Sequence, residues 1–167
     1  MKLILFRHGL AIEREEFQKK KQDDTLRPLV EKGRLRTELM AKFLEKNISE
    51  VDILVSSPYV RATQTAAILK RVLKPQKYSE CVELIPSAPQ VAFASWLKAN
   101  AGTARTVIAV GHSPQLEVFA SWCLSGLTES FLQIKKSGLL LLEIESFSEV
   151  AANKAELQYM IAPKLLE

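Results

Sequence analysis

The sequence predicts an α/β fold, a three-layer α/β/α sandwich around a central, largely parallel (mixed) sheet. Apolar runs that are typical of buried strands alternate along the chain with amphipathic helical patterns. Such alternation implies crossover connections, which place helices on both faces of a parallel sheet. No repeat or linker interrupts the pattern, and 167 residues, 47% of them apolar, are enough to bury one core. We therefore expect a single domain over residues 1–167.

The first half of the chain supplies two expected strands and two expected helices. The apolar run from Leu3 predicts a buried first strand, and residues 30–47 predict an amphipathic helix because apolar side chains recur there at a spacing of three or four. These side chains are Leu35, Leu39, Met40, Phe43 and Leu44. A short apolar run from Val51 predicts a second strand. Ser57 and Pro58 are typical of an N-cap and a first helical position, so a helix is expected to begin there.

The second half continues the alternation. A weak strand is expected over residues 81–85, followed by a helix over residues 89–99 whose apolar positions include Val91, Trp96 and Leu97. The remaining expected elements are a strand at 105–110, a helix at 114–124, a strand at 138–145 and a last strand at 155–162. The chain thus returns to the sheet after each helix.

Composition and charge exclude several classes of protein. The net charge is +4, but the one dense basic run, Lys19 to Lys21, is flanked by acidic residues and has no interleaved aromatic side chains for stacking on bases. We expect no nucleic-acid partner, an exposed loop at this run, and an anionic substrate. No apolar run approaches the ~18 residues of a membrane span, so we expect no membrane partner and a cytoplasmic location. Cys81 and Cys123 lie in apolar segments, which predicts reduced core residues.

Three expected strand ends bring unusual side chains toward one crevice. Arg7 and His8 end the first strand, Arg61 lies in the first turn of the helix after the second, and His112 follows the run at 105–110. Ligands of such folds bind outside the carboxyl ends of the strands. Each side chain also has a purely structural interpretation. However, the chain has only two histidines, and both stand beside glycine at a strand end.

This set of side chains suits phosphoryl transfer. Guanidinium groups match phosphate oxygens with forked hydrogen bonds, and a neutral imidazole can serve as the nucleophile. Arg61 lies where a helix dipole favours acidic residues, which indicates a nearby anion. The sequence has no Gly-rich phosphate loop, no cysteine phosphatase signature and no Asp and His cluster for metal ligands. We therefore expect no metal and no other cofactor.

At these residues the sequence resembles the histidine phosphatase (phosphoglycerate mutase-like) superfamily. The matching motifs are "RHG" at 7–9, "SSPYVRATQTA" at 56–66 and "GHSP" at 111–114. Within the superfamily the chain looks most like the short SixA-type phosphohistidine phosphatases, because it is compact and carries "LRPLVEKG" at 26–33 and "KKSGLLLLEIE" near its end. The resemblance covers nearly the whole chain.

The resemblance implies roles for individual residues. His8 is implied as the phosphorylated nucleophile, with Arg7, Arg61 and His112 completing the phosphate pocket. Arg27, in the "RPL" piece, is a candidate for the rim of the pocket, and a structural salt bridge is the alternative.

The sequence departs from the alcohol-phosphate members of the superfamily, which carry a glutamate general acid in a loop. The nearest counterpart is Glu83 in "VELIPSAPQ", either a candidate acid or an exposed strand-end carboxylate. Little chain remains for a lid over the substrate, so we expect an open pocket.

The sequence therefore predicts a metal-independent phosphatase that works through a phosphohistidine intermediate. The expected substrate is a phosphohistidine on a protein, such as a histidine phosphotransfer domain. A phosphomonoesterase or mutase acting on a small phosphate ester is one alternative. A non-catalytic phosphate-binding module is the other, and the presence of His8 speaks against it.

Overall fold

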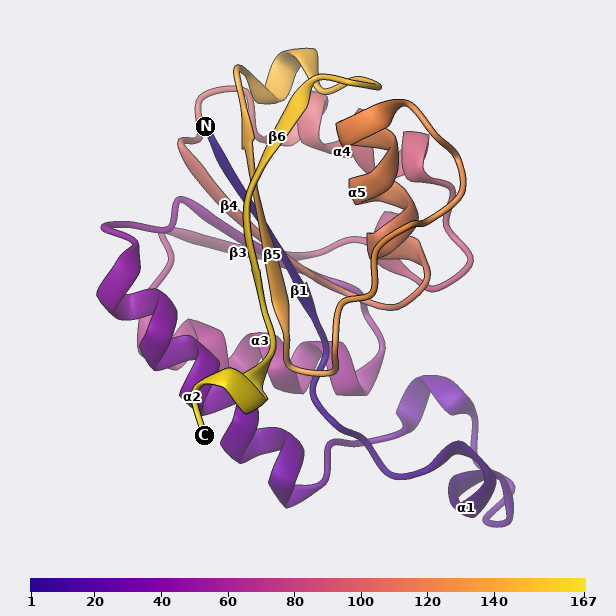
Figure 1. Ribbon diagram of the computed structural model, residues 1–167. Coiled ribbons are helices and arrows are strands. Elements are labelled where there is room, and N and C mark those ends of the chain that lie inside the picture. Colours follow the sequence, from indigo (N-terminus) through magenta and orange to yellow (C-terminus); the bar gives the residue numbers. More distant parts are fainter.

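The computed structural model describes residues 1–167 and confirms the expected alternation of strands and helices (Figure 1). The strands are β1 (Lys2–Arg7), β2 (Ile53–Ser56), β3 (Lys77–Glu80), β4 (Thr106–Gly111), β5 (Leu139–Ile144) and β6 (Ala155–Ile161). The helices are α1 (Arg14–Gln18), α2 (Glu31–Asn47), α3 (Val60–Leu73), α4 (Gln90–Asn100) and α5 (Gln115–Ser125). Short 3₁₀ turns are η1 (Asp24–Leu26), η2 (Val82–Leu84), η3 (Phe147–Glu149) and η4 (Pro163–Leu165).

The six strands form one mixed sheet in the order β3-β2-β4-β1-β5-β6. The first four strands of this order run parallel, whereas β5 is antiparallel to β1 and β6 is antiparallel to β5. The sequences of the central strands are continuous apolar runs because both faces of these strands are covered. All residues of β4, for example, are buried.

Helices cover both faces of the sheet, α2 and α3 on one side and α4 and α5 on the other (Figure 1). Alternate residues of β1 therefore belong to different cores: Ile4 and Phe6 pack beneath α2 and α3, and Leu3 and Leu5 pack beneath α4 and α5. This arrangement confirms the predicted α/β/α sandwich. No helix is long and apolar enough to span a membrane.

Two predicted element boundaries were wrong. Helix α3 begins at Val60 with Tyr59 at its N-cap, so Ser57 and Pro58 lie in the loop before it. The Ser57 hydroxyl instead contacts His112. Residues 81–85 contain the turn η2 (Val82–Leu84) and no strand, while the edge strand is the preceding segment Lys77–Glu80. An edge strand has one free side and needs no apolar run, which is why the sequence pattern missed it.

The buried faces of two helices also differ from the predicted ones. Leu35 is 60% exposed and Val91 is 51% exposed, although both were expected on apolar faces. In α2 the buried face is turned toward Gly33 and Thr37. The reason is a close approach of backbones: a Cβ on Gly33 would lie 2.1 Å from the carbonyl oxygen of Leu10. The helix is thereby held against the loop that follows β1.

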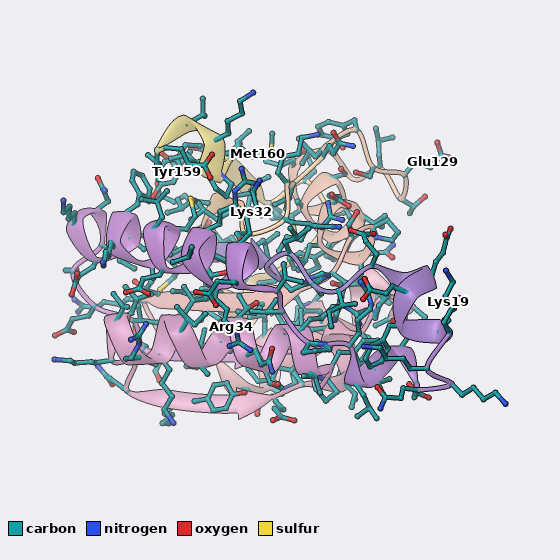
Figure 2. All side chains as sticks on the ribbon, turned by 90° about the horizontal axis from the view of Figure 1, so that it is seen from below. Lys19, Lys32, Arg34, Glu129, Tyr159 and Met160 are labelled. Atoms are coloured by element: carbon teal, nitrogen blue, oxygen red, sulfur yellow. The ribbon has the colours of Figure 1, made fainter.

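The two cysteines and the basic run lie as predicted. Cys81 and Cys123 are buried and unpaired. Lys19 to Lys21 are exposed, and Lys19 projects from the end of the molecule that carries α1 (Figure 2).

Candidate active site

Three neighbouring strands bring the predicted residues together. Strands β2, β4 and β1 are adjacent in the sheet and end at the same edge. The His8 amide donates to the carbonyl of Gly111 at 3.0 Å, so the segment after β1 stays paired with the end of β4. The imidazole rings of His8 and His112 have centroids 5.0 Å apart.

His8 is oriented and held neutral. Its Nδ1 lies 2.7 Å from the carbonyl oxygen of Gly9; a carbonyl can only accept, so Nδ1 carries the proton and Nε2 keeps its lone pair. Burial lowers the pKa of His8 to about 3, and the charges of Arg61, Arg7 and Arg27 act in the same direction. The imidazole is therefore neutral at physiological pH, as a nucleophile must be.

His112 is held from two sides. Its Nε2 lies 2.8 Å from the Ser57 hydroxyl, and the Tyr59 ring packs edge-on against the imidazole, with centroids 5.0 Å apart. Burial lowers the pKa of His112 to about 2, with further contributions from His8 and the nearby arginines. Its Nδ1 is buried and has no hydrogen-bond partner.

Arg61 is almost completely buried, with 2% of its side chain exposed, and Asp24 holds it. One guanidinium nitrogen lies 3.1 Å from the Asp24 carboxylate, and another donates to the Asp24 carbonyl at 2.8 Å. The guanidinium also packs over the Tyr59 ring at 4.9 Å. Burial lowers the pKa of Arg61, and the Asp24 carboxylate opposes this effect.

Arg27 shares the same carboxylate. Its Nε lies 3.1 Å from Asp24 Oδ1, and it donates to the carbonyl of Ile12 at 2.7 Å. Arg27 thus forms the salt bridge that was the structural alternative, while its charge still lowers the pKa of both histidines. Arg14 makes a third ion pair with Asp24 at 3.3 Å. Sequence analysis did not identify Asp24 as a site residue.

Arg7 is positioned by a second carboxylate that sequence analysis missed. Arg7 donates to the carbonyl of Ile134 at 2.7 Å. The amide of Ile134 donates to Glu117 at 2.9 Å, and the Ser113 hydroxyl donates to the same carboxylate. Burial lowers the pKa of Arg7, and the Glu117 charge opposes this effect. Glu117 lies in the first turn of α5, where an acidic residue is ordinary, so its role left no signal in the sequence.

Three buried nitrogens of this cluster have no hydrogen-bond partner: Nε of Arg7, Nε of Arg61 and Nδ1 of His112. Buried polar atoms are nearly always paired, and three unpaired nitrogens on cationic or polarisable groups favour an anion as the missing partner. The cluster has the hydrogen-bonding capacity and charge for a phosphoryl group.

Glu83 lies at the edge of this cluster, in η2. Its carboxylate accepts a hydrogen bond from the Cys81 thiol at 3.0 Å, and its carbonyl accepts one from Gln115 at 3.2 Å. No hydrogen bond or ion pair joins Glu83 to His8, Arg7, Arg61 or His112.

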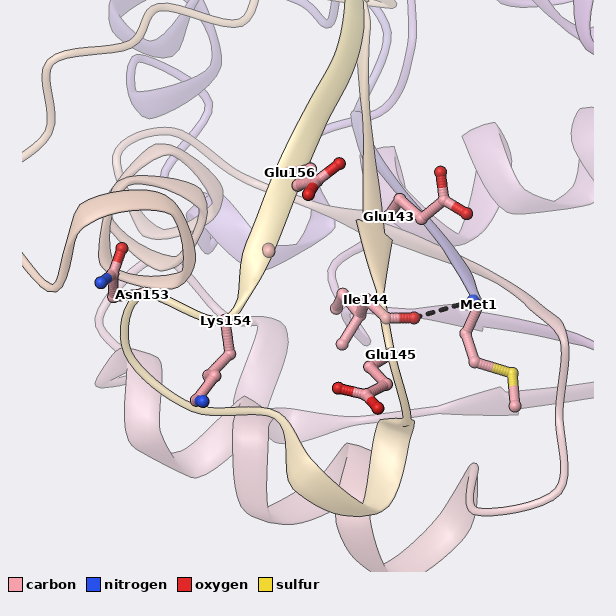
Figure 3. A pocket seen from close by; sticks show the side chains of 8 residues that line it. Met1, Glu143, Ile144, Glu145, Asn153, Lys154 and Glu156 are labelled. Carbon is pink, nitrogen blue, oxygen red and sulfur yellow. Dashed lines mark hydrogen bonds between the residues drawn. The ribbon is translucent and has the colours of Figure 1, made fainter.

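A hollow of about 520 Å³ lies at the opposite end of the sheet (Figure 3). Its lining includes Glu143, Glu145 and Glu156, and the Met1 ammonium there donates to the carbonyl of Ile144 at 2.7 Å. Its charge disfavours a phosphate, and no arginine or histidine lines it. No group of three or more His, Cys, Asp or Glu side chains in the molecule could hold a metal ion.

Comparisons with known proteins bear on the family and the fold. Residues 3–85 match the histidine phosphatase superfamily (branch 1). An uncharacterized protein of Picosynechococcus sp. is 32% identical over 167 residues, 99% of each chain. The structure of the protein histidine phosphatase SixA complexed with tungstate has a TM-score of 0.82, with 24% identity and 100% of both chains covered. A putative phosphohistidine phosphatase SixA from Nakamurella multipartitia also gives 0.82, with 22% identity, covering 97% of this chain and 95% of that one. The chain belongs to the histidine phosphatase superfamily by its sequence, and it shares its fold with these two structures.

Proposed function

We propose that this protein removes the phosphoryl group from a phosphohistidine on another protein, with His8 as the nucleophile. Membership of the superfamily supports the coarser statement that the protein is a phosphatase. The finer statement, the phosphohistidine substrate, is supported by the fold shared with two structures described as histidine phosphatases and by the chemistry of the site.

One observation carries the catalytic part of the proposal: His8 is neutral, oriented through Nδ1, and surrounded by arginines. The Nε2 lone pair attacks phosphorus, the N–P bond of the substrate breaks, and its electron pair leaves with the substrate imidazole, which takes a proton. Water then attacks the phosphoryl group on His8. That N–P bond breaks, inorganic phosphate departs, a proton goes to solvent, and His8 regains its lone pair.

The arginines and His112 stabilise the charge that develops on the phosphoryl oxygens. Arg7 and Arg61 each keep an unpaired Nε for this purpose, and fixed donors in a buried site need no reorganisation. If the Ser57 hydroxyl donates to Nε2 of His112, then Nδ1 carries the ring proton and is available as a third donor.

The leaving group decides between a phosphohistidine and an alkyl phosphate. An alkyl ester without an acid releases an alkoxide, the base of a group about as weakly acidic as water, with a pKa of ~15.7. An imidazole, with a free pKa of ~6.5, is protonated readily near neutrality. No hydrogen bond or ion pair joins Glu83 to the four site residues, so a substrate that needs little acid catalysis suits the site better.

A substrate comparison tests the proposal. We expect a phosphorylated histidine phosphotransfer domain to be hydrolysed much faster than 3-phosphoglycerate, as judged by kcat/KM. Glu83→Gln should reduce the ester activity more than the phosphohistidine activity, and Glu80→Gln, on the exposed strand β3, is the matched control. EDTA should leave both rates unchanged. Preference for the ester with Glu83 essential would point to a small-molecule phosphatase, and no turnover at all would point to a phosphate-binding module.

A further inference from the structure

A groove of about 460 Å³ adjoins the candidate active site, and five of its eight lining residues are basic. We call it the basic groove. Its basic residues are Arg7, Arg36, Lys135, Lys136 and Lys164. The other three lining residues are uncharged, so no acidic side chain lines the groove.

The basic groove is assembled from segments that are distant in the sequence. Arg7 ends β1, Arg36 lies in α2, Lys164 lies in η4, and the two remaining lysines precede β5. Hydrogen bonds fix this last segment against the nucleophile: the Ser137 amide donates to the His8 carbonyl at 3.1 Å, and the Arg7 amide donates to the Gly138 carbonyl at 3.0 Å. Arg7 therefore belongs both to the lining of the groove and to the candidate phosphate site.

Most of the charge in the basic groove is not neutralised by the protein itself. Lys136 and Lys164 make no side-chain hydrogen bond or ion pair, and the Lys135 ammonium contacts only the amide oxygen of Gln133. Among these residues only Arg36 forms an ion pair, with Glu167, through two hydrogen bonds at 2.6 and 3.1 Å.

One carboxylate, that of Glu167, lies beside the basic groove. The hydrogen bond from Arg36 is the largest cause that lowers the pKa of the Glu167 carboxyl, and the charges of Lys32 and Lys164 add to it. Lys32 lies on α2 (Figure 2), so the cations around the Glu167 carboxylate outnumber it.

An acidic protein surface fits these features better than a nucleic acid does. No aromatic residue lines the groove, so it offers no platform on which bases could stack. Arg7 lines the groove and holds the phosphoryl group under the proposed function, so the part of a substrate that adjoins its phosphorylated side chain comes to lie at the groove. A protein with carboxylates beside its phosphohistidine meets both requirements.

We infer that the basic groove docks an acidic face of the phosphoprotein substrate, next to its phosphorylated histidine. The inference rests on the proposed function. Complementary charge of this kind speeds encounter and selects partners. It also explains how the protein would favour a macromolecular substrate over a free phosphohistidine, whose only anchor is the phosphate pocket.

The experiment compares two variants with the same change in net charge. The groove variant is Lys135→Glu with Lys136→Glu, and the matched control is Lys77→Glu with Lys98→Glu, two exposed lysines on β3 and α4. The substrates are a phosphorylated histidine phosphotransfer domain with acidic residues around its histidine, and the free phosphohistidine amino acid. Neither variant alters a residue of the catalytic cluster.

For the groove variant we expect kcat/KM on the phosphoprotein to fall by about tenfold or more, mainly through KM, which corresponds to about 1.4 kcal/mol. The loss on free phosphohistidine should be no more than about threefold, because salt screens exposed charges over ~8 Å. The control variant should lose little on either substrate. Changing carboxylates of the phosphotransfer domain to lysine should restore the activity of the groove variant.

Two results would overturn the inference: equal rates of groove and control variants on the phosphoprotein, or equal losses of the groove variant on both substrates. Failure of the proposed function looks different, because the wild-type protein would then hydrolyse neither phosphohistidine substrate. In that case calorimetry tests the docking surface, because it measures the affinity of each variant for the unphosphorylated acidic domain. If the groove variant bound that domain as tightly as the wild type does, the basic groove would not be its docking surface.

Discussion

The two ends of the central sheet are built from the same strands but carry opposite charge. Strand β1 begins beside the acidic hollow of Figure 3 and ends at Arg7. Because β5 is antiparallel to β1, it follows Lys135 and Lys136 at the basic end and finishes at the acidic end, where Glu143 and Glu145 lie. The direction of the strands alone therefore does not determine which end of the sheet is acidic and which is basic.

Burial is the difference that matters between the two ends. At the carboxyl end of β1, His8 is 6% exposed and His112 is 1% exposed, whereas Glu145 and Glu156 at the other end are exposed. Charges in a buried site interact strongly, and exposed charges are screened by water and salt. Each end has a hollow of similar size, yet the unpaired buried nitrogens belong to the basic end. The unpaired polar atoms therefore distinguish the site from the acidic hollow, whereas volume does not.

The largest expected effect comes from the nucleophile. His8→Ala should lower turnover by at least about 10⁴-fold, because no other group takes over nucleophilic attack, and His112→Ala should lower it by about 10²-fold. Quenching without acid after reaction with a labelled substrate should leave label on the wild type and none on His8→Ala. Glu143→Ala, at the acidic end, is the matched control. Label that persists on His8→Ala would contradict the assignment.

The arginines come next. Arg7→Ala and Arg61→Ala should each reduce kcat/KM by about 10²- to 10³-fold, since each removes fixed donors from the developing charge. Lysine at either position should restore only part of the activity because it lacks the forked geometry. Lys154→Ala at the acidic hollow should change little. If the two arginine variants lost no more than this control, the phosphate pocket would have to lie elsewhere.

Glu117 is expected to act through Arg7. Glu117→Gln should lower kcat/KM by about tenfold, in the range of couplings between residues of one hydrogen-bond network, because the neutral amide holds Ile134 and Arg7 less firmly. In an Arg7→Ala background the same change should cost much less. Glu129→Gln, at an exposed position (Figure 2), is the control. Additive losses in the double variant would mean that Glu117 does not work through Arg7.

The smallest effect concerns stability and pH. Burial lowers the pKa of His8 to about 3 and of His112 to about 2, while an unfolded histidine titrates near ~6.5. Below that pH the unfolded chain binds protons that the folded protein does not, so the free energy of unfolding decreases as pH falls, by up to about 1.4 kcal/mol per pH unit for each histidine. Denaturation between pH 6.5 and 5 should show this slope. His8→Asn with His112→Asn should flatten it, and an unchanged slope would refute the neutral pair.

The sequence by itself determined the alternation of elements and the chemistry at the strand ends. Apolar runs mark the central strands because both of their faces are buried, and two histidines beside glycines are visible without any structure. The sequence pattern was less informative where an element packs against the rest of the molecule on one side only. Examples are the edge strand Lys77–Glu80 and the face of α2 that carries Leu35.

Only the tertiary structure decided which side chains support the site. Asp24 reaches Arg61 across 37 positions of the chain, Ser57 reaches His112 across 55, and the carbonyl of Ile134 reaches Arg7 across 127. No local pattern encodes a partner at such a separation. The lowered pKa values of the histidines and the convergence of four segments in the basic groove likewise exist only after folding. Both depend on burial and on contacts between distant parts of the chain, and not on the order of neighbouring residues.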